Sequence, residues 1–378
     1  MTMQCVKQEM KSRYVFRCNG QNIWLMLICL GCVAFQSMWP VHAADQVITR
    51  DKTLFGKIEA VTSEAVRLLR RGSTADLQEI TVSDILMIQF DEEPQELIEA
   101  KRRLVKKEFE AALHAVEKIN ENQIEESSVA VRGEYAYVQA VAAGRIAMET
   151  ADGIPSSLRR VEKVIDQFTR SIHHYELLEL AGDLEVAQGR ADKAQEFYDK
   201  MIEGPPLIAL RARRLSGNVL ASEDRHLEAI RTFEKVQSEN LDLNGVEQEK
   251  MAACLDQATS LIALRRSDEA VLCIQEMLLR EFPEEVPVSS AEELLGKAYS
   301  LLGQSFIETG KNQEALIAYL TVDLVYNTDP NIHAESLLQL IELWTRGGYP
   351  RRAAEAREKL VNSYPENEAA TQFDSSPE

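Results

Sequence analysis

The chain has 378 residues, of which 61 are acidic and 42 are basic, so its formal net charge is −19 at pH 7. Nucleic acid and anionic lipid surfaces repel a protein of this charge, so the composition argues against either as a partner.

The first 43 residues have the features of an export signal. Four basic residues precede an apolar run at residues 23–35, and residues 41–43 form a small-x-small cleavage pattern. We predict cleavage after Ala43, which sends the chain to the periplasm or cell envelope. One alternative is a retained membrane anchor, although Gln36, Ser37 and Pro40 interrupt the apolar run before it reaches the roughly 20 residues that span a bilayer. The other is a lipoprotein that is lipidated at Cys32.

Cleavage would change the charge and the cysteine content of the chain. The leader holds four basic residues and one acidic residue, which leaves 38 basic and 60 acidic residues and a net charge of −22. It also holds four of the six cysteines, so only Cys254 and Cys273 remain. Two cysteines are too few for a disulfide framework or a complete zinc site. They fall on facing helices of one predicted hairpin, so a disulfide and two buried thiols both fit, and the thiols are the preferred interpretation.

Residues 44–93 show alternating hydrophobicity, which indicates short β-strands. Apolar side chains alternate within residues 54–60, 66–68, 80–82 and 86–90, and turn residues separate these runs. We expect four or five strands in a small antiparallel β-meander or β-barrel-like domain, which resembles SH3-like and Sm-like domains in length and rhythm only. Some domains of that shape bind RNA. Here ten carboxylates outnumber six basic residues, so nucleic-acid binding is a remote alternative.

Residues 297–330 contain the clearest helical pattern in the chain. Two amphipathic helices are joined at residues 309–311, with apolar side chains at helical spacing on one face of each. Gly303 and Ala315 stand where the two helices would approach most closely, Tyr319 would fill the space beside them, and Pro330 follows the second helix. This stretch resembles the tetratricopeptide repeat (TPR), a 34-residue helix–turn–helix motif.

The same pattern recurs through residues 94–366. A small residue opens the second helix of each predicted hairpin, and these residues are Ala112, Ser157, Ala194, Ala229, Ala270, Ala315 and Ala353. We therefore expect a mainly α-helical protein, a TPR-like α-solenoid of about seven helical hairpins, preceded by the small β domain. The acidic tail at residues 367–378 is polar enough to be disordered.

The TPR resemblance implies a binding surface and leaves the partner open. Stacked hairpins form a concave face from their first helices, and in TPR-like proteins this face holds an extended peptide or a partner helix. We predict a groove that is acidic at one end and basic in the middle, with Arg214 and Lys297 exposed. The candidate partner-binding residues are Glu176, Glu179, Asp183, Arg211, Arg214, Asn218, Ile262, Lys297, Gln304 and Glu308.

One sharper possibility is a carboxylate clamp, in which some TPR domains grip the C-terminal carboxylate of a peptide. Arg214, Asn218 and Lys297 stand at three of the five clamp positions. Asp256 and Leu301 occupy the other two, and a carboxylate at Asp256 would repel the ligand. We therefore expect ordinary solvated polar residues rather than a clamp.

No catalytic or metal-binding motif is present in the sequence. It lacks GxSxG, HExxH, the phosphate-binding GxxxxGK[ST] and GxGxxG. His173 and His174 are adjacent, so on a helix they diverge, and the other histidines are isolated. We predict no enzyme, no metal and no cofactor. The function indicated is a non-catalytic scaffold or adaptor that binds a protein partner, and a self-associating structural component of the envelope is the alternative.

Overall fold

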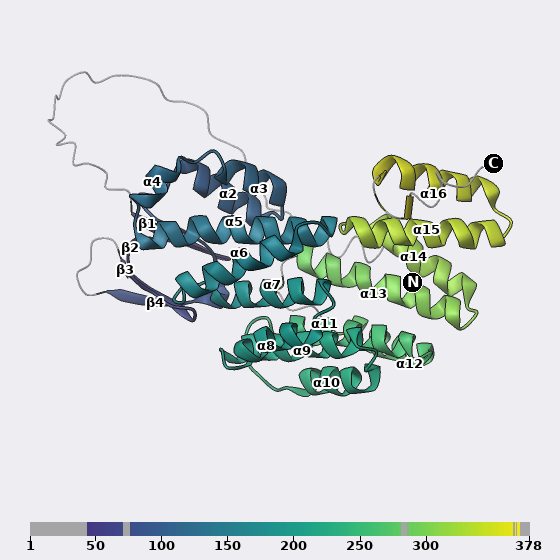
Figure 1. Ribbon diagram of the computed structural model, residues 1–378. Coiled ribbons are helices and arrows are strands. Elements are labelled where there is room, and N and C mark those ends of the chain that lie inside the picture. Colours follow the sequence, from purple (N-terminus) through teal and green to yellow (C-terminus); the bar gives the residue numbers. More distant parts are fainter. Residues whose placement is uncertain are drawn as a thin grey trace, which may run out of the picture. The chain divides into compact units, whose positions relative to one another are not determined.

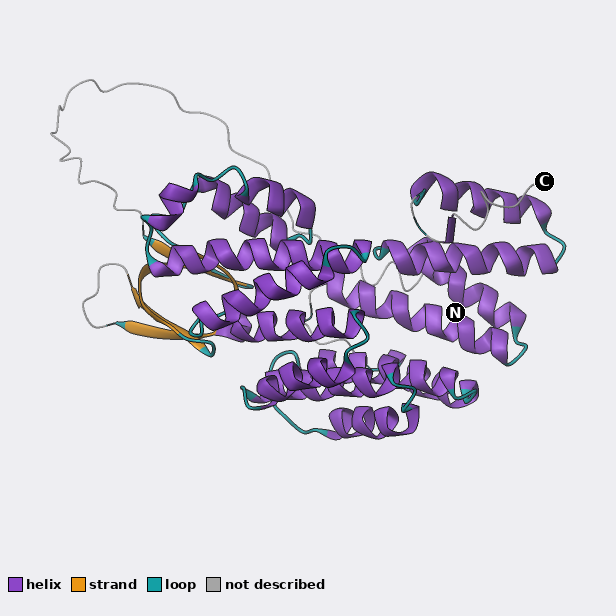
Figure 2. Cartoon of the chain, in the orientation of Figure 1, coloured by secondary structure: helices purple, strands orange, loops and turns teal. Residues whose placement is uncertain are grey.

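The computed structural model describes residues 44–70, 76–280, 286, 288–365, 367 and 369–370 (Figure 1). The predicted signal peptide and most of the predicted acidic tail lie outside these residues. The described chain is mainly α-helical with a small β-sheet near its N-terminal end (Figure 2). None of its described helices is both long enough and apolar enough to cross a membrane.

The sheet has five antiparallel strands in the order β4-β3-β2-β1-β5. The strands are β1 (Asp45–Thr49), β2 (Thr53–Val61), β3 (Ala65–Arg70), β4 (Leu77–Thr81) and β5 (Ile85–Gln89). The first four are consecutive neighbours, as in a meander, and β5 crosses over to pair with β1. The small antiparallel β domain expected from the sequence is therefore present, with β4 and β5 as the two edges of the described sheet. β1 was not among the alternating runs found in the sequence.

Alternate residues of the strands form one side of a core that continues into the helices. Val47, Val66 and Leu68 are fully buried, as the two-residue period of a strand requires when one face is covered. They belong to the same apolar cluster as Leu97 and Val138, which lie on helices. The sheet is therefore packed against the helical repeats, and burial of this shared core stabilises both.

In the part of the chain that the structure describes, seven helical hairpins follow the sheet, in agreement with the prediction of about seven. Their helices are α2 (Gln95–Val105) with α3 (Phe109–Val116), α5 (Val129–Thr150) with α6 (Ile154–Gln167), α7 (His174–Ala187) with α8 (Ala191–Ile202), α9 (Pro206–Ser222) with α10 (His226–Ser238), α11 (Val246–Ala263) with α12 (Ser267–Leu278), α13 (Val288–Glu308) with α14 (Asn312–Val325), and α15 (Pro330–Arg346) with α16 (Pro350–Ser363). A short helix, α4 (Glu121–Glu125), lies between the first two hairpins. All seven of the small residues predicted to open the second helices are buried.

A glycine facing an aromatic ring explains the close packing of three hairpins. A Cβ atom added to Gly182 would lie 2.3 Å from the ring of Tyr198. The corresponding distance is 2.6 Å between Gly303 and Tyr319, and the Gly217 and Phe233 pair repeats the arrangement at 2.5 Å. Such separations are far shorter than van der Waals contact, so only glycine fits. The prediction that Tyr319 fills the space beside Gly303 is confirmed.

The hairpins stack in chain order. Each second helix from α6 to α14 contacts the first helix of the next hairpin, and the first helices α5, α7, α9, α11, α13 and α15 also contact one another in sequence. This double contact is the arrangement of a TPR-like α-solenoid, in which one hairpin buries the apolar face of its neighbour. The first helices thus form a continuous inner row, on which the functional candidates lie.

The two cysteines of the helical region lie across the α11–α12 hairpin. The sulfur atoms of Cys254 and Cys273 face each other across the hairpin, and the Cα atoms are 6.4 Å apart. That Cα separation is within the range of protein disulfides. The structure therefore brings the two cysteines of this hairpin together, as their predicted positions on facing helices require.

Candidate partner-binding site

All ten candidate partner-binding residues lie on first helices of the hairpins. Three are on α7, three on α9, one on α11 and three on α13. Most of them form hydrogen bonds or ion pairs with one another or with neighbouring residues. Their role in partner binding remains a prediction, and their surroundings divide them into two groups.

The middle of the inner row is centred on Asp256 of α11. Its carboxylate accepts hydrogen bonds from Arg214 Nη1 at 2.8 Å, Asn218 Nδ2 at 3.2 Å and Lys297 Nζ at 2.7 Å. Burial alone would raise the pKa of Asp256, but Lys297 and Arg214 outweigh it and hold the pKa below its ordinary value. We call these four residues the Asp256 cluster. The three clamp-position side chains are thus occupied by a carboxylate of the chain itself.

Within the Asp256 cluster, one of the two cations is less exposed than predicted. The side chain of Arg214 is only 14% exposed, against 41% for Lys297, so the expectation of two exposed cations is wrong for Arg214. Ile262 is also a buried core residue, not a groove residue. Gln304 is exposed, and Glu308 accepts hydrogen bonds from Arg265 and Ser267. The surface available to a partner in the middle of the row is therefore smaller than the sequence suggested.

A cleft of about 590 Å³ lies at the N-terminal end of the inner row, where β5, α2 and the α2–α3 turn face α5, α7 and α9. We call it the N-terminal cleft. One wall is apolar and includes Leu86, Val105 and Phe109. Leu86 and Val105 are 47% and 56% exposed, which is unusual for large apolar side chains beside a cavity. Exposed apolar groups that rim a cleft are typical of binding surfaces.

The opposite wall of the N-terminal cleft is polar and carries three predicted residues, Glu176, Glu179 and Arg211. Arg211 Nη2 donates to Glu179 at 2.8 Å. The Nε atom of Arg211 is buried, and no described group accepts a hydrogen bond from it. The Arg211 side chain as a whole is 43% exposed, so the terminal N–H groups of its guanidinium can donate to a carboxylate or carbonyl oxygen of a ligand.

A buried ionic cluster forms the base of the N-terminal cleft. Lys101 Nζ donates to the backbone oxygen of Ile88 at 2.5 Å, to Glu93 at 2.5 Å and to Glu134 at 3.0 Å. Burial raises the pKa of Glu93 to about 7 although Lys101 opposes the shift. Glu134 is also buried, yet Lys101 and His173 lower its pKa to about 2. This cluster, which we call the Lys101 cluster, connects β5, the turn before α2, and α5.

His173 extends the Lys101 cluster to the start of α7. Its Nε2 lies 3.1 Å from Glu134, and its ring stacks on Tyr137 with centroids 3.4 Å apart. Tyr137 in turn donates to Glu176 at 2.8 Å. Burial alone would lower the pKa of His173, but Glu134 and Glu176 outweigh it and raise the pKa to about 9. His173 is therefore protonated at neutral pH, and it balances Glu134 and Glu176.

Sequence reasoning missed Lys101, Glu134 and His173. Lys101 and Glu134 look like ordinary charged residues of amphipathic helices, and the adjacent pair His173 and His174 resembles no ligand motif. These residues matter because the fold brings them together: Glu134 contacts Lys101, 33 residues before it, and His173, 39 residues after it. The one signal in the sequence was the position of His173 directly before a first helix, which by itself predicts nothing.

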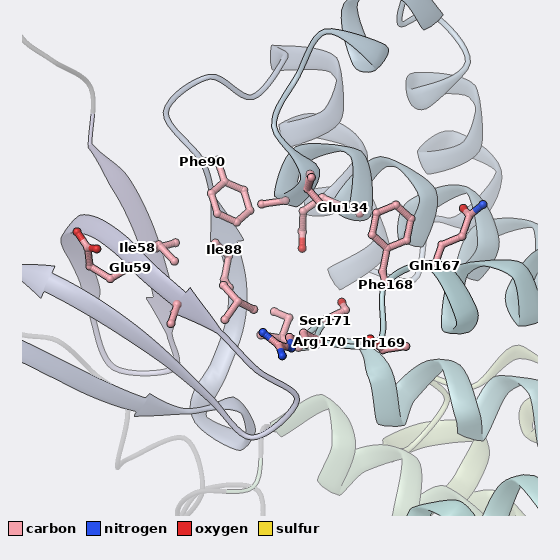
Figure 3. A pocket seen from close by; sticks show the side chains of 16 residues that line it. Ile58, Glu59, Ile88, Phe90, Glu134, Gln167, Phe168, Thr169, Arg170 and Ser171 are labelled. Atoms are coloured by element: carbon pink, nitrogen blue, oxygen red, sulfur yellow. The ribbon is translucent and has the colours of Figure 1, made fainter.

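A second cavity of about 470 Å³ lies between the sheet, the start of α5 and residues 167–172 (Figure 3). We call it the sheet cleft. Ile58, Ile88 and Phe90 extend from the sheet, and Phe168 faces them from the segment after α6 (Figure 3). The lining is mainly apolar, and it shares Ile88 and Glu134 with the N-terminal cleft.

Neither cleft has the ligand set of a metal centre. Within the described ranges, no group of three or more histidine, cysteine, aspartate or glutamate side chains could hold a metal ion. The charged groups of the Lys101 cluster bind one another, and their geometry joins elements together.

No protein family and no curated protein matches this chain. Among solved structures, the type IV pilus biogenesis factor PilW is 14% identical and covers 62% of this chain and 97% of its own, with a TM-score of 0.44. A tetratricopeptide repeat protein from Parabacteroides merdae is 14% identical over 74% of this chain and 96% of its own, with a TM-score of 0.46. YrrB, a TPR protein with an unusual peptide-binding site, is 18% identical and covers 57% of this chain and 98% of its own, with a TM-score of 0.32. The likeness is one of helical-repeat architecture, which the hairpins of this chain display directly.

Proposed function

We propose that this protein is a non-catalytic scaffold that binds a segment of a partner protein in the N-terminal cleft. The observation that carries the proposal is the pairing of an exposed apolar wall with a polar wall around a cavity of about 590 Å³. A cavity of this size lies within the range of ligand sites, roughly 300–1,000 Å³. The inner row of first helices supplies the polar wall, as the repeat architecture predicts.

The two walls define the chemistry of the bound segment. Leu86, Val105 and Phe109 would bury apolar side chains, and each such side chain contributes about 1.5–3 kcal/mol when it leaves water. The terminal N–H groups of the Arg211 guanidinium would donate to a carboxylate or backbone carbonyl oxygen. An amphipathic segment with apolar side chains next to an acidic residue satisfies both walls.

The site is proposed as a binding site without catalysis. Perturbed pKa values in a cleft can mark catalytic groups. Here each perturbed group has a structural partner: Lys101 holds Glu93 and Glu134, and His173 holds Glu134. The export signal predicted in residues 1–43 places the scaffold in the periplasm or cell envelope in this proposal.

The proposal is tested by a charge placed on the apolar wall. The chain from Ala44 onward is used as bait in envelope extract, with chemical cross-linking and mass spectrometry. Val105→Asp should reduce capture of the partner at least tenfold while the melting temperature stays within a few degrees, because Val105 is 56% exposed. Leu272→Asp is the matched control, since Leu272 is 60% exposed on α12 and lies outside both clefts. Equal capture by all three chains would show that the partner binds elsewhere.

A further inference from the structure

The sheet cleft lies along an unpaired stretch of strand edge. The β1–β2 ladder ends at the pair Asp45 and Gly56. Beyond this pair, β2 continues to Val61 and pairs with β3 on one side only. Among the described residues, no strand pairs with residues 57–61 on the other side. The carboxylate of Asp45 caps the end of the ladder by accepting the N–H groups of Ile58 at 2.8 Å and Asp91 at 3.0 Å.

The lining of the cleft shows that it follows this edge. Ile58, Glu59, Ala60 and Val61 are four consecutive residues, and all four line the cavity. Successive side chains of a strand point to opposite faces, so a cavity over one face would meet every second residue. The β-bulge between Ile58 and Ala60 accounts for one departure from that alternation. A cavity that meets four residues in a row therefore lies beside the strand, where backbone groups are accessible.

We propose that the sheet cleft is a second binding site, at which an extended segment of a partner protein adds a strand to the open edge of β2. Strand addition combines backbone hydrogen bonds with pockets for alternate side chains. Ile58, Phe90 and Phe168 provide the apolar surface for those side chains. Five residues of a strand span about 17 Å, which matches the length of the unpaired stretch at residues 57–61.

The charges of the cleft specify one further property of the segment. Glu59 is paired with Lys57 at 2.9 Å, and Glu134 belongs to the Lys101 cluster. Arg170 is exposed at the cleft, and no ion pair joins it to another described residue. The unpaired charge in the cleft is therefore the positive charge of Arg170. The occupant carries a carboxylate near Arg170, from an acidic side chain or from its C-terminus.

The chain's own residues before β1 do not match this requirement. Extending β1 backwards in the register of Asp45 and Gly56 would place residues 40–44 opposite residues 57–61. Residue 40 is proline, which cannot donate a backbone hydrogen bond to a ladder, and residues 36–43 contain no carboxylate. The chemistry therefore favours a partner segment over this part of the leader.

A labelled peptide tests the proposal on the chain from Ala44 onward, which contains every described residue. The probe is a fluorescein-labelled hexapeptide of alternating threonine and valine that ends in aspartate. Binding is measured by fluorescence anisotropy, and amide hydrogen exchange is followed at residues 57–61. We expect binding with slowed exchange at these residues, and about tenfold weaker binding when the two central amides of the peptide are N-methylated.

Three variants make the test specific. Val129→Trp should weaken binding about tenfold by filling the cleft, because Val129 is 63% exposed beside it. Arg170→Glu should weaken it by a similar factor, and Leu272→Trp should leave it unchanged. The proposal is overturned if the probe does not bind, if N-methylation or Val129→Trp has no effect, or if residues 57–61 keep their exchange rates. It is also overturned if a chain that retains residues 1–43 excludes the probe, because the leader would then be the occupant.

Discussion

The Asp256 cluster and the N-terminal cleft both contain charged residues on the inner faces of first helices, yet only the cleft has a cavity beside them. At the Asp256 cluster, Arg214, Asn218 and Lys297 converge on one buried carboxylate. At the N-terminal cleft, Arg211 keeps a buried Nε atom with no acceptor among the described groups, beside a cavity of about 590 Å³. Inner-face charges are paired within the protein at both places, since Arg211 binds Glu179 and lies 3.9 Å from Glu249. The N-terminal cleft differs in having a cavity and exposed apolar side chains beside its charges.

The difference also explains how the first helices are held together. Asp256 on α11 binds cationic groups from both α9 and α13, so one carboxylate connects three consecutive hairpins. The Lys101 cluster does the same at the N-terminal end, where it connects the sheet to α2 and α5. Both clusters stabilise the stack, and only the second lies at the base of a cleft.

The largest effect is expected from removing the charge at the centre of the Lys101 cluster. Lys101→Met leaves Glu93 and Glu134 buried without their cation, so the free energy of unfolding should fall by about 3–5 kcal/mol. Urea unfolding followed by circular dichroism measures the change. Lys107→Met is the control, because the Lys107 side chain is 65% exposed and its loss should cost less than about 0.5 kcal/mol. A loss below about 1 kcal/mol for Lys101→Met would show that the cluster does not hold the sheet to the helices.

The pH dependence of stability should differ from that of a typical acidic protein. The folded-state pKa of His173 is raised to about 9, so its contribution is complete below its unfolded pKa of 6.5 and is lost as the pH rises through 9. The pKa of Glu93 is raised to about 7, so a rise in pH from 4.5 to 7 also lowers the free energy of unfolding. The lowered pKa of Glu134, about 2, means that its contribution is lost only in acid.

We therefore expect the free energy of unfolding to decrease between about pH 6.5 and 9, by an amount on the order of 3 kcal/mol for His173. Urea unfolding across this range measures the change. His173→Gln should flatten the curve above pH 6.5, and the exposed His114→Gln should leave it unchanged. A wild-type curve that is flat from pH 6.5 to 9 would contradict the assigned charge of His173.

A smaller effect on stability is expected at the Asp256 cluster. Asp256→Ser should reduce the free energy of unfolding by about 2 kcal/mol, because Arg214 keeps Glu249 and Lys297 can reach solvent. The same change removes the internal carboxylate, so the variant should gain binding to a short peptide with a free C-terminal carboxylate. Isothermal titration of that peptide and its amidated form measures the gain. Asp268→Ser, at a 77% exposed position, is the control. If Asp256→Ser binds neither form of the peptide, Arg214, Asn218 and Lys297 do not form a carboxylate-binding site when Asp256 is removed.

The smallest effect on stability is expected from the double variant Arg211→Gln and Glu179→Gln. It removes one cation and its buried anion together, so the free energy of unfolding should change by about 1 kcal/mol or less. Capture of the partner should nevertheless fall about tenfold, because the donor on the polar wall is lost. Arg213→Gln is the control on the outer side of the same helix, where Arg213 pairs with Glu239. Unchanged capture by the double variant would place the partner away from Arg211.

Much of the fold follows from the sequence because its signals are local. The buried residues from Ala112 to Ala353 recur at repeat spacing, and each glycine and ring pair lies within one hairpin. β1 gave no such signal, since it has only five residues and its side chains are mostly half-buried. Asp256 was recognised as incompatible with a clamp, but its own three donors come from two other hairpins. The clefts depend on contacts between distant segments, and no local spacing encodes them.

The measurement that tests the central claim most directly is site-specific photo-crosslinking. A photoreactive phenylalanine analogue is placed at Val105, on the apolar wall of the N-terminal cleft, and in a second chain at the equally exposed Leu272. We expect a discrete cross-linked partner peptide from position 105 that is lost when Arg211→Gln and Glu179→Gln are added, and none from position 272. A cross-link from position 272 alone, or one from position 105 that persists in the double variant, would contradict a binding site in the N-terminal cleft.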